Sequence, residues 1–415
     1  MSDATDTSDG PASSDSLDRE VSSASSFAIS DASDGSDSLN RALVDTVVWL
    51  ERFIIVADQR DLELIALWAA HTHAADVFYT TPRLIIDSAM PGSGKTTLLE
   101  HLMRLAKSPV QAASITSAAL LTRLIQNETK TLMIDEADRS LDPRKPGVED
   151  LIAIINSGYK RGATRPVLMP GKGGEWVAEH MPTFSPVAMA GNAPHLPDDT
   201  RSRALRIVLM PDLEGRAEDS DWENLDADGY ELGARLADAV AAVVERIRVA
   251  RPAMPEGCRG RAKERWSPLA RIAHVAGGPW DRIVAELIHR DLEEVEQELR
   301  DGLANVPPAV QLVTHLFEVW PETQDFVRSS DLISQIVDKA PDTWGEQSSY
   351  GKRLTAQRMG RMLSQAFKIH TSKRFDDVRG YHRSSFEVVW RRFGLTPSVE
   401  TVGTGDSVRS VGGVS

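Results

Sequence analysis

The chain has 415 residues, 41% of them apolar, which is enough for two or three domains with sizeable cores. Its formal net charge of −14 at pH 7 argues against a protein that coats DNA through an overall basic surface. A single cysteine, Cys258, excludes an intrachain disulfide and a cysteine-ligated zinc site, and the apolar runs are shorter than the ~20 residues of a membrane span, so we expect a cytoplasmic protein outside the membrane.

The chain begins with a segment rich in serine and aspartate. Residues 1–40 contain eight Asp, one Glu and one Arg, and Phe27 is their only aromatic residue. Such a composition buries too little apolar surface to offset the entropy of ordering, so it predicts a disordered acidic tail. A tail that imitates DNA or binds a partner protein is the alternative.

A glycine-rich loop follows the first predicted strand. Residues 41–80 show helical apolar spacing, and "RLIIDS" then reads as a buried strand before "AMPGSGKTTLLEHL". The loop matches the phosphate-binding pattern G-x-x-x-x-G-K-[ST], except that Ala89 stands at the first glycine. Backbone N–H groups at such a helix start bind phosphates. The predicted nucleotide-binding residues are Pro91, Gly92, Ser93, Gly94, Lys95, Thr96 and Thr97.

Two carboxylates end the next buried strand, "TLMIDEAD". Phosphoryl transfer needs one carboxylate in the Mg²⁺ shell and another that orients or deprotonates water. We therefore predict that Thr96 and Asp135 bind Mg²⁺, that Glu136 is the base, and that ATP and Mg²⁺ are the cofactors. A strand that ends in a solvated acidic turn is the alternative.

Polar residues also surround two later strands. "PVAMAGNAP" puts Asn192 at a strand tip, where it could sense a γ-phosphate or serve only as a turn residue. Arg201, Arg203 and Arg206 cluster around the start of "ALRIVLM". An arginine finger offered to a neighbouring subunit would explain the cluster, and surface ion pairs are the alternative.

A hairpin is predicted between Asp135 and Asn192. "RPVLM" and "EWVAEHM" flank the turn "PGKGG", and residues 158–174 carry basic side chains without an acidic one. These residues predict a DNA-binding hairpin, with an ordinary surface hairpin as the alternative. The predicted DNA-binding residues here are Lys160, Arg161, Arg165 and Lys172.

The C-terminal part reads as a separate small domain. Residues 309–395 show three helical patterns and a β-hairpin, which is a winged-helix pattern, and residues 351–395 carry eleven Lys and Arg against three Asp and Glu. The third helix would bury Leu354, Met359, Met362, Leu363 and Phe367. The predicted duplex-binding residues are Arg358, Arg361, Lys373, Arg374 and Arg379. Use of the same fold for protein contacts is the alternative.

The motifs resemble those of the AAA+ ATPases. Walker A (Ala89–Thr96), Walker B (Leu132–Glu136) and sensor 1 (Asn192) occur in the family's order. "SRA" resembles the Ser-Arg-Cys finger motif of clamp loaders, which makes Arg203 the first candidate and Arg201 its competitor. The resemblance implies a helical lid, which residues 231–303 could supply, with Arg261 as the sensor 2 arginine and Arg265 next.

A closer resemblance is to an uncharacterised ATPase domain of actinobacterial phage, prophage and plasmid replication proteins. It covers residues 45–395 and includes "IDEAD", "INSGYKRGA" and "SRALRIVLM". The hairpin before sensor 1 resembles that of superfamily 3 hexameric helicases. This likeness implies a homo-oligomeric ring, a hexamer, with six Lys172 side chains in a central pore that holds single-stranded DNA.

Together these features predict an α/β fold in five segments. The sequence favours an ATP-hydrolysing DNA helicase or translocase. An ATP-switched initiator or loader that does not unwind DNA is the main alternative, and an ATPase that remodels protein partners is another. The segments are a disordered tail at 1–40, an AAA+ core at 41–210, an acidic loop and helical lid at 211–303, a winged-helix domain at 309–395 and a disordered tail at 396–415.

Overall fold

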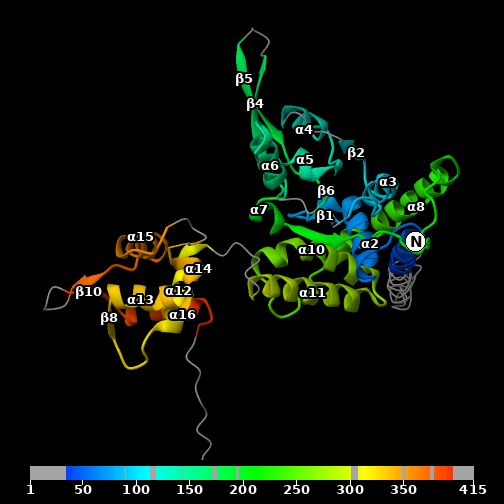
Figure 1. Cartoon of the computed structure of the whole chain (residues 1–415). Helices are drawn as coiled ribbons and strands as arrows, with labels where there is room; N and C mark the ends of the chain where they lie inside the picture. Colours follow the sequence, from blue (N-terminus) through cyan, green and yellow to red (C-terminus); the bar gives the residue numbers. More distant parts are fainter. Residues whose placement is uncertain are drawn as a thin grey trace, which may run out of the picture. The chain divides into compact units, whose positions relative to one another are not determined.

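The computed structural model shows a chain that divides into two compact units, Met1–Gln297 and Glu298–Ser415, each with a core of its own (Figure 1). The structure describes residues 34–88, 90–112, 118–142, 144–170, 175–192, 196–300, 307–346, 348, 352–373 and 378–395.

A five-stranded parallel sheet forms the centre of the first unit, with the strand order β2-β3-β6-β1-β7. Every residue of β1, β3 and β6 is buried, as a parallel sheet covered on both faces requires. This confirms the predicted α/β sheet. The strands are β1 (Arg83–Asp87), β2 (Pro109–Ala112), β3 (Thr131–Ile134), β6 (Val187–Gly191) and β7 (Ala204–Val208).

Alternate residues of each strand face two different cores, because side chains alternate along a strand. Leu84 and Ile86 of β1 belong to the larger core, and Ile85 belongs to the smaller one. The larger core is built with a helix over residues 34–51, α2 (Arg60–His73), α3 (Lys95–Leu105), α8 (Trp222–Ala242), α9 (Val244–Val249), α10 (Gly260–Ala276) and α11 (Trp280–Arg300). The smaller core includes α4 (Ala118–Leu124), α5 (Ala137–Ser140) and α6 (Val148–Ser157). The short elements η1 (Ala75–Val77) and α7 (Asp198–Arg201) also belong to this unit.

The first helix begins earlier than the sequence predicted. Residues 34–40, assigned to the acidic tail, are helical, and Leu39 is fully buried. The Asn40 side-chain oxygen accepts a hydrogen bond from Trp280 Nε1 at 2.8 Å. The predicted boundary at residue 40 is therefore too late.

The helices after the sheet also differ from the predicted arrangement. Side chains of α8, α10 and α11, such as Leu236, Leu269 and Leu287, share one core with α2, α3 and the helix over residues 34–51. Glycine permits close packing here, since a Cβ at Gly233 would lie 2.0 Å from the Arg104 carbonyl oxygen. The predicted separate lid is therefore part of the first unit's main core.

Two histidines of α2 make packing contacts. His71 is fully buried and its Nε2 lies 2.8 Å from Thr81 Oγ1. His73 Nε2 lies 2.8 Å from the Leu105 carbonyl oxygen. Burial lowers the pKa of His71 to about 3, so its ring is neutral in the folded protein.

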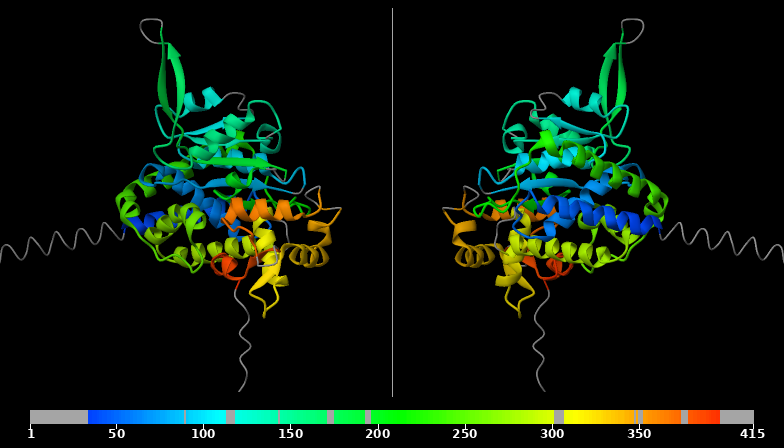
Figure 2. Two further views of the ribbon diagram at one scale, coloured as in Figure 1. Left: turned by 90° about the vertical axis from the view of Figure 1, so that its left-hand side faces the viewer. Right: turned by 90° about the vertical axis from the view of Figure 1, so that its right-hand side faces the viewer.

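The predicted hairpin is confirmed and stands away from the sheet in all views (Figures 1 and 2). Strands β4 (Thr164–Pro170) and β5 (Trp176–Pro182) pair antiparallel along their whole length, from Thr164 opposite Pro182 to Pro170 opposite Trp176. Five of the seven β5 residues are exposed. The turn, with Lys172, lies outside the described residues.

The second unit contains the three predicted helices and the predicted hairpin. The helices are α12 (Pro308–Val319), α13 (Ser329–Lys339) and α15 (Ala356–Phe367), and the hairpin is β9 (Ser372–Lys373) with β10 (Arg379–His382). The structure adds α14 (Pro341–Trp344), α16 (Ser384–Arg392) and β8 (Phe326–Arg328), which pairs with β10.

Aromatic residues dominate the core of the second unit. Trp320, Trp344, Tyr381, Phe386 and Trp390 are all buried in it. Thr355 caps α15 by accepting a hydrogen bond from the Arg358 N–H. The helix faces the core as predicted: Leu354, Met359 and Leu363 are buried, and Met362 and Phe367 are half-buried. None of the helices that the structure describes in either unit is long and apolar enough to cross a membrane.

Candidate nucleotide-binding site

The phosphate loop connects the end of β1 to the start of α3. Gly92 and Gly94 adopt left-handed conformations with φ of 78° and 80°, which glycine permits without strain. Hydrogen bonds within the loop fix its shape: Ser93 Oγ donates to the Met90 carbonyl at 2.8 Å, and Ser88 Oγ lies 2.8 Å from Ser93 Oγ. Ala89 lies outside the described residues.

The two predicted magnesium ligands meet in the structure. Thr96, in the first turn of α3, donates its hydroxyl hydrogen to Asp135 Oδ2 at 3.0 Å, although 39 residues separate them in the chain. Hydroxyl and carboxylate oxygens are ligands that Mg²⁺ prefers, so this donor set fits the ion. Lys95 Nζ is 3.4 Å from the Met90 carbonyl, above the same loop.

Glu136 holds a strained backbone next to this pair. Its φ and ψ are 47° and 45°, the left-handed region that non-glycine residues rarely adopt. Its N–H donates to Asp135 Oδ1 at 2.8 Å, and its exposed carboxylate pairs with Arg139 at 3.1 Å. Strain of this kind gathers at functional sites, which supports a functional role for this residue.

Asn192 lies beside these carboxylates because of the strand order. It directly follows β6, which lies between β3 and β1 in the parallel sheet. The carboxyl ends of these strands therefore bring Asp135, Asn192 and the phosphate loop to one edge. The exposed Asn192 also donates its N–H to Asp138 Oδ1 at 3.4 Å.

An ion pair at the root of the loop was not predicted. Asp87 is the last residue of β1. Its Oδ2 accepts a hydrogen bond from Nη2 of Arg206, a residue of β7, at 2.6 Å. Asp87 is nearly buried, and its Oδ1 accepts the Ser88 N–H at 2.7 Å. The signal in the sequence was a pair of charged residues in apolar strands: Asp87 at the end of β1 and Arg206 within β7. This pairing gives Arg206, part of the predicted arginine cluster, a role in holding the loop.

Arg201 and Arg203 lie at the opposite edge of the sheet. They precede the amino end of β7, whereas the phosphate loop follows the carboxyl end of β1, its parallel neighbour. Arg203 pairs with Asp199 and its side chain is 11% exposed; Arg201 is exposed. This edge is opposite to the one that carries the phosphate loop of the same chain.

The predicted sensor 2 arginine is not beside the phosphate loop. Arg261, at the start of α10, pairs with Glu264 at 3.2 Å, and the Glu264 backbone carbonyl accepts from Thr80 Oγ1 just before β1. This places Arg261 near the amino end of β1, whereas the phosphate loop follows its carboxyl end, and the sensor 2 role of Arg261 stays a prediction. Arg265 is buried and bonds Ser202 and Asp291, which is a structural role.

The basic residues at the base of the hairpin have partners inside the protein. Lys160 pairs with Glu264 at 2.9 Å, and Arg165 pairs with Asp150 at 2.9 Å. Arg161 donates to the backbone carbonyls of residues 75 and 78, at 2.7 and 2.8 Å. A run of basic residues shows charge but not its partners, so the sequence could not predict these contacts, and the DNA-binding role of the three residues stays a prediction.

Sequence reasoning also missed an aromatic residue on the hairpin. Trp176 is 68% exposed, beside the "PGKGG" turn, and Leu168 on the facing strand is 62% exposed. The signal was the tryptophan next to a basic turn. An exposed indole of this kind can stack on a nucleic-acid base.

The predicted duplex-binding residues of the second unit differ in exposure. Arg361, Lys373 and Arg379 are exposed. Arg358 is half-buried and donates to the Lys352 carbonyl. Arg374 lies outside the described residues.

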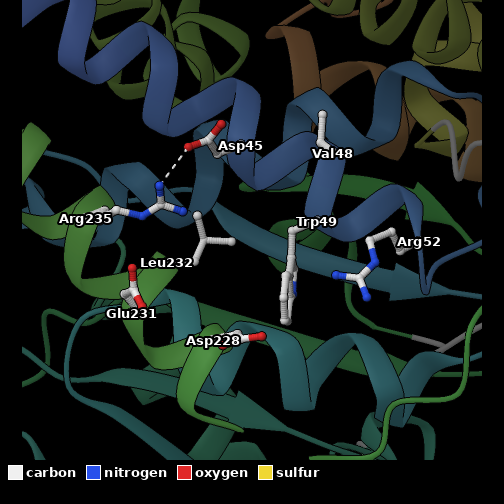
Figure 3. A pocket seen from close by; sticks show the side chains of 8 residues that line it. All are labelled: Asp45, Val48, Trp49, Arg52, Asp228, Glu231, Leu232 and Arg235. Atoms are coloured by element: carbon white, nitrogen blue, oxygen red, sulfur yellow. Dashed lines mark hydrogen bonds and ion pairs between the residues drawn. The ribbon is translucent and has the colours of Figure 1, made fainter. Parts of the chain in front are cut away.

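A separate pocket of about 400 Å³ lies between the helix over residues 34–51 and α8 (Figure 3). Figure 3 shows Trp49 between the two helices, and Asp45 pairs with Arg235 across the opening at 3.1 Å. None of the predicted site residues lines it. The pocket is lined by Asp45, Val48, Trp49, Arg52, Asp228, Glu231, Leu232 and Arg235.

Residues 216–393 match the model of a protein family of unknown function, DUF3631. The match covers less than half of the chain and begins after the phosphate loop. It is therefore narrower than the predicted resemblance over residues 45–395. No curated protein matches the chain. The motif residues that the structure describes between Pro91 and Arg203 are therefore supported by their geometry alone.

Solved structures of two proteins are among those with some similarity to this chain. Two apo structures of the C-terminal region of NrS-1 (305–718) are 14% and 13% identical to this chain, with TM-scores of 0.36 and 0.37. Each alignment covers 83% of this chain, and the two alignments cover 74% and 75% of the respective NrS-1 chains. A JCV helicase with a bound small molecule is 14% identical, with a TM-score of 0.29, and covers 62% of this chain and 61% of the other.

Proposed function

We propose that this chain is an ATP-hydrolysing DNA helicase or translocase of the phage or plasmid replication type, which acts as a ring of identical subunits. The observation that supports it most is the contact between the Thr96 hydroxyl and the Asp135 carboxylate, next to the strained Glu136. A hydroxyl, two carboxylates and a lysine at one edge of a parallel sheet are the groups that phosphoryl transfer uses.

Each residue has a separate task in this proposal. The N–H groups of residues 91–97 and the Lys95 ammonium bind phosphate oxygens. Thr96 and Asp135 hold Mg²⁺, which when bound supplies positive charge to the phosphate oxygens. Glu136 orients or deprotonates the attacking water, and Asn192 holds that water in line. Arg203 of a neighbouring copy, or Arg201, neutralises the charge that develops.

DNA contacts come from both units. The β4–β5 hairpin carries Lys172 for the phosphates of a single strand, and the exposed Trp176 beside it offers a stacking surface. The second unit acts as a winged-helix domain on duplex DNA, through Arg361, Lys373 and Arg379. The resemblance of the hairpin to that of superfamily 3 helicases supports a hexamer.

A second function is favoured by the charge of the second unit. Residues 351–395 carry a net charge of +8 in a chain whose total is −14. A basic unit of this kind suits an initiator or loader in which ATP controls assembly on duplex DNA without unwinding. Remodelling of protein partners has no comparable support.

The steady-state rate of ATP hydrolysis tests the proposal. It is measured with and without single-stranded DNA for the wild type, Glu136→Gln and Lys172→Ala, with Glu179→Gln on the hairpin as a matched carboxylate control. We expect loss of hydrolysis in Glu136→Gln and loss of DNA stimulation in Lys172→Ala. Hydrolysis that ignores DNA would favour the initiator, and a wild type without hydrolysis would exclude the motor.

A further inference from the structure

Tyr159 connects the base of the hairpin to the edge that carries Arg203. It follows α6, and its fully buried ring lies near two guanidinium groups, with Arg203 Cζ at 5.8 Å and Arg83 Cζ at 6.0 Å from the ring centroid. Its hydroxyl has no hydrogen-bond partner among the described residues. The ring face, and not the hydroxyl, therefore makes the polar contacts of this side chain.

Arg83 fastens both ends of the hairpin to β1. It is 1% exposed, and it donates to the Ser185 carbonyl at 2.6 Å and to the Ile155 carbonyl. Ile155 lies before the hairpin and Ser185 after it. Gly158 packs on the returning chain so closely that a Cβ would lie 2.0 Å from the Thr183 carbonyl oxygen. The chain segments before and after the hairpin are therefore bound to Arg83 and packed on each other next to Tyr159.

Two like charges share the Tyr159 ring. Arg203 pairs with Asp199, whereas Arg83 bonds carbonyl oxygens and, among the described residues, no carboxylate. Burial, with the nearby charge of Arg203 in addition, lowers the pKa of Arg83 to about 9. Arg203 is thus repelled by Arg83 on one side and held by Asp199 on the other.

We propose that Tyr159 is a positioning residue that couples Arg203 to the base of the β4–β5 hairpin. This inference rests on the proposed function, in which Arg203 meets a nucleotide of the neighbouring subunit. A phosphate presented there draws the Arg203 guanidinium away from Asp199 and from the ring. The ring then faces Arg83 alone, and Arg83 holds the two ends of the hairpin. The state of one subunit's nucleotide is in this way passed to the DNA-binding hairpin of the next.

Fluorinated rings at position 159 test the coupling in the full-length protein. Phenylalanines with one, two or three fluorine atoms keep the shape of the ring and progressively weaken its attraction for cations. The measurement is the ratio of ATP hydrolysis rates with and without single-stranded DNA. Tyr159→Phe should match the wild type, because the hydroxyl has no partner. Across the fluorinated series we expect this ratio to fall about fivefold.

The controls separate coupling from folding. The same fluorinated residues at Phe386, buried in the second unit, should leave the ratio unchanged, and the midpoint of thermal unfolding should stay constant across the Tyr159 series. If DNA stimulates the wild type but the ratio stays the same across the fluorinated Tyr159 variants, the coupling alone is overturned. A wild type without DNA stimulation would overturn the proposed motor function and the coupling with it.

Discussion

Acidification should loosen the helix over residues 34–51 from α3, the helix that begins at the phosphate loop. His101 of α3 is fully buried, and its Nδ1 accepts a hydrogen bond from Trp49 Nε1 at 2.9 Å. An indole N–H can only donate, so Nδ1 must be unprotonated and the other nitrogen carries the hydrogen toward Ser220 Oγ, at 3.0 Å. Protonation of His101 breaks the bond to Trp49.

The size of the effect follows from the pKa of His101. Burial, with Arg104 and Arg52 adding positive charge nearby, lowers this pKa from 6.5 to about 3. The unfolded chain binds the proton more tightly, so stability is full above about pH 6.5 and falls by about 1.4 kcal/mol per pH unit between 6.5 and 3. Between about pH 7.5 and pH 5 the loss is therefore about 2 kcal/mol for this one residue.

His101→Gln isolates that contribution, because the glutamine amide oxygen can still accept from Trp49 but does not titrate. The free energy of unfolding of the first unit is measured by urea denaturation at both pH values. Burial raises the pKa of other carboxyls, such as the buried Asp61 and the half-buried Glu63. These groups change stability with pH in the opposite sense, and their contributions cancel in the comparison of the two proteins. The wild type should lose about 2 kcal/mol more than His101→Gln on acidification. Equal losses of unfolding free energy in the two proteins would refute the conclusion that His101 is buried in its neutral form.

Three further changes probe the hairpin and the second unit. Gly158→Ala places a Cβ against the Thr183 carbonyl and should lower the free energy of unfolding by about 3 kcal/mol; an unchanged thermal midpoint would contradict that packing. Trp176→Ala should weaken single-stranded DNA binding by about 1–3 kcal/mol in fluorescence anisotropy, whereas Glu179→Gln should not, and equal affinities would exclude base stacking. Arg361→Ala should weaken duplex binding and reduce the slope of log affinity against log salt by about 0.9, and an unaltered slope would remove Arg361 from the phosphate contacts.

Local patterns predicted most of the strands and the centre of the candidate site. Buried apolar runs that end in Asp87, Asp135 and Asn192 identify parallel strands, and parallel strands bring their carboxyl ends to one edge. The turn "PGKGG" between two alternating runs was enough to predict the hairpin. These inferences succeed because each depends on a short stretch of sequence and on the geometry of a sheet.

Contacts between distant segments could not be predicted in the same way. An amphipathic helix shows which face is buried but not which element covers it, so α8, α10 and α11 were taken for a lid. The serine- and aspartate-rich composition before residue 40 indicated disorder, although a helix begins there. Leu39 of that helix is buried in the same core as α8, α10 and α11. The partner of Lys160 was hidden for a similar reason, because Glu264 lies 104 positions further along the chain.

The central claim is that residues 91–97, which include Lys95, bind Mg²⁺–nucleotide together with Asp135. The most direct test is calorimetric titration of the full-length protein with Mg²⁺ and a non-hydrolysable ATP analogue, beside Lys95→Ala and, as a matched surface control, Lys263→Ala. We predict binding by the wild type and by Lys263→Ala, with affinity at least about tenfold weaker in Lys95→Ala, a loss of ~1.4 kcal/mol. Equal binding by Lys95→Ala, or no binding by the wild type, would contradict the account.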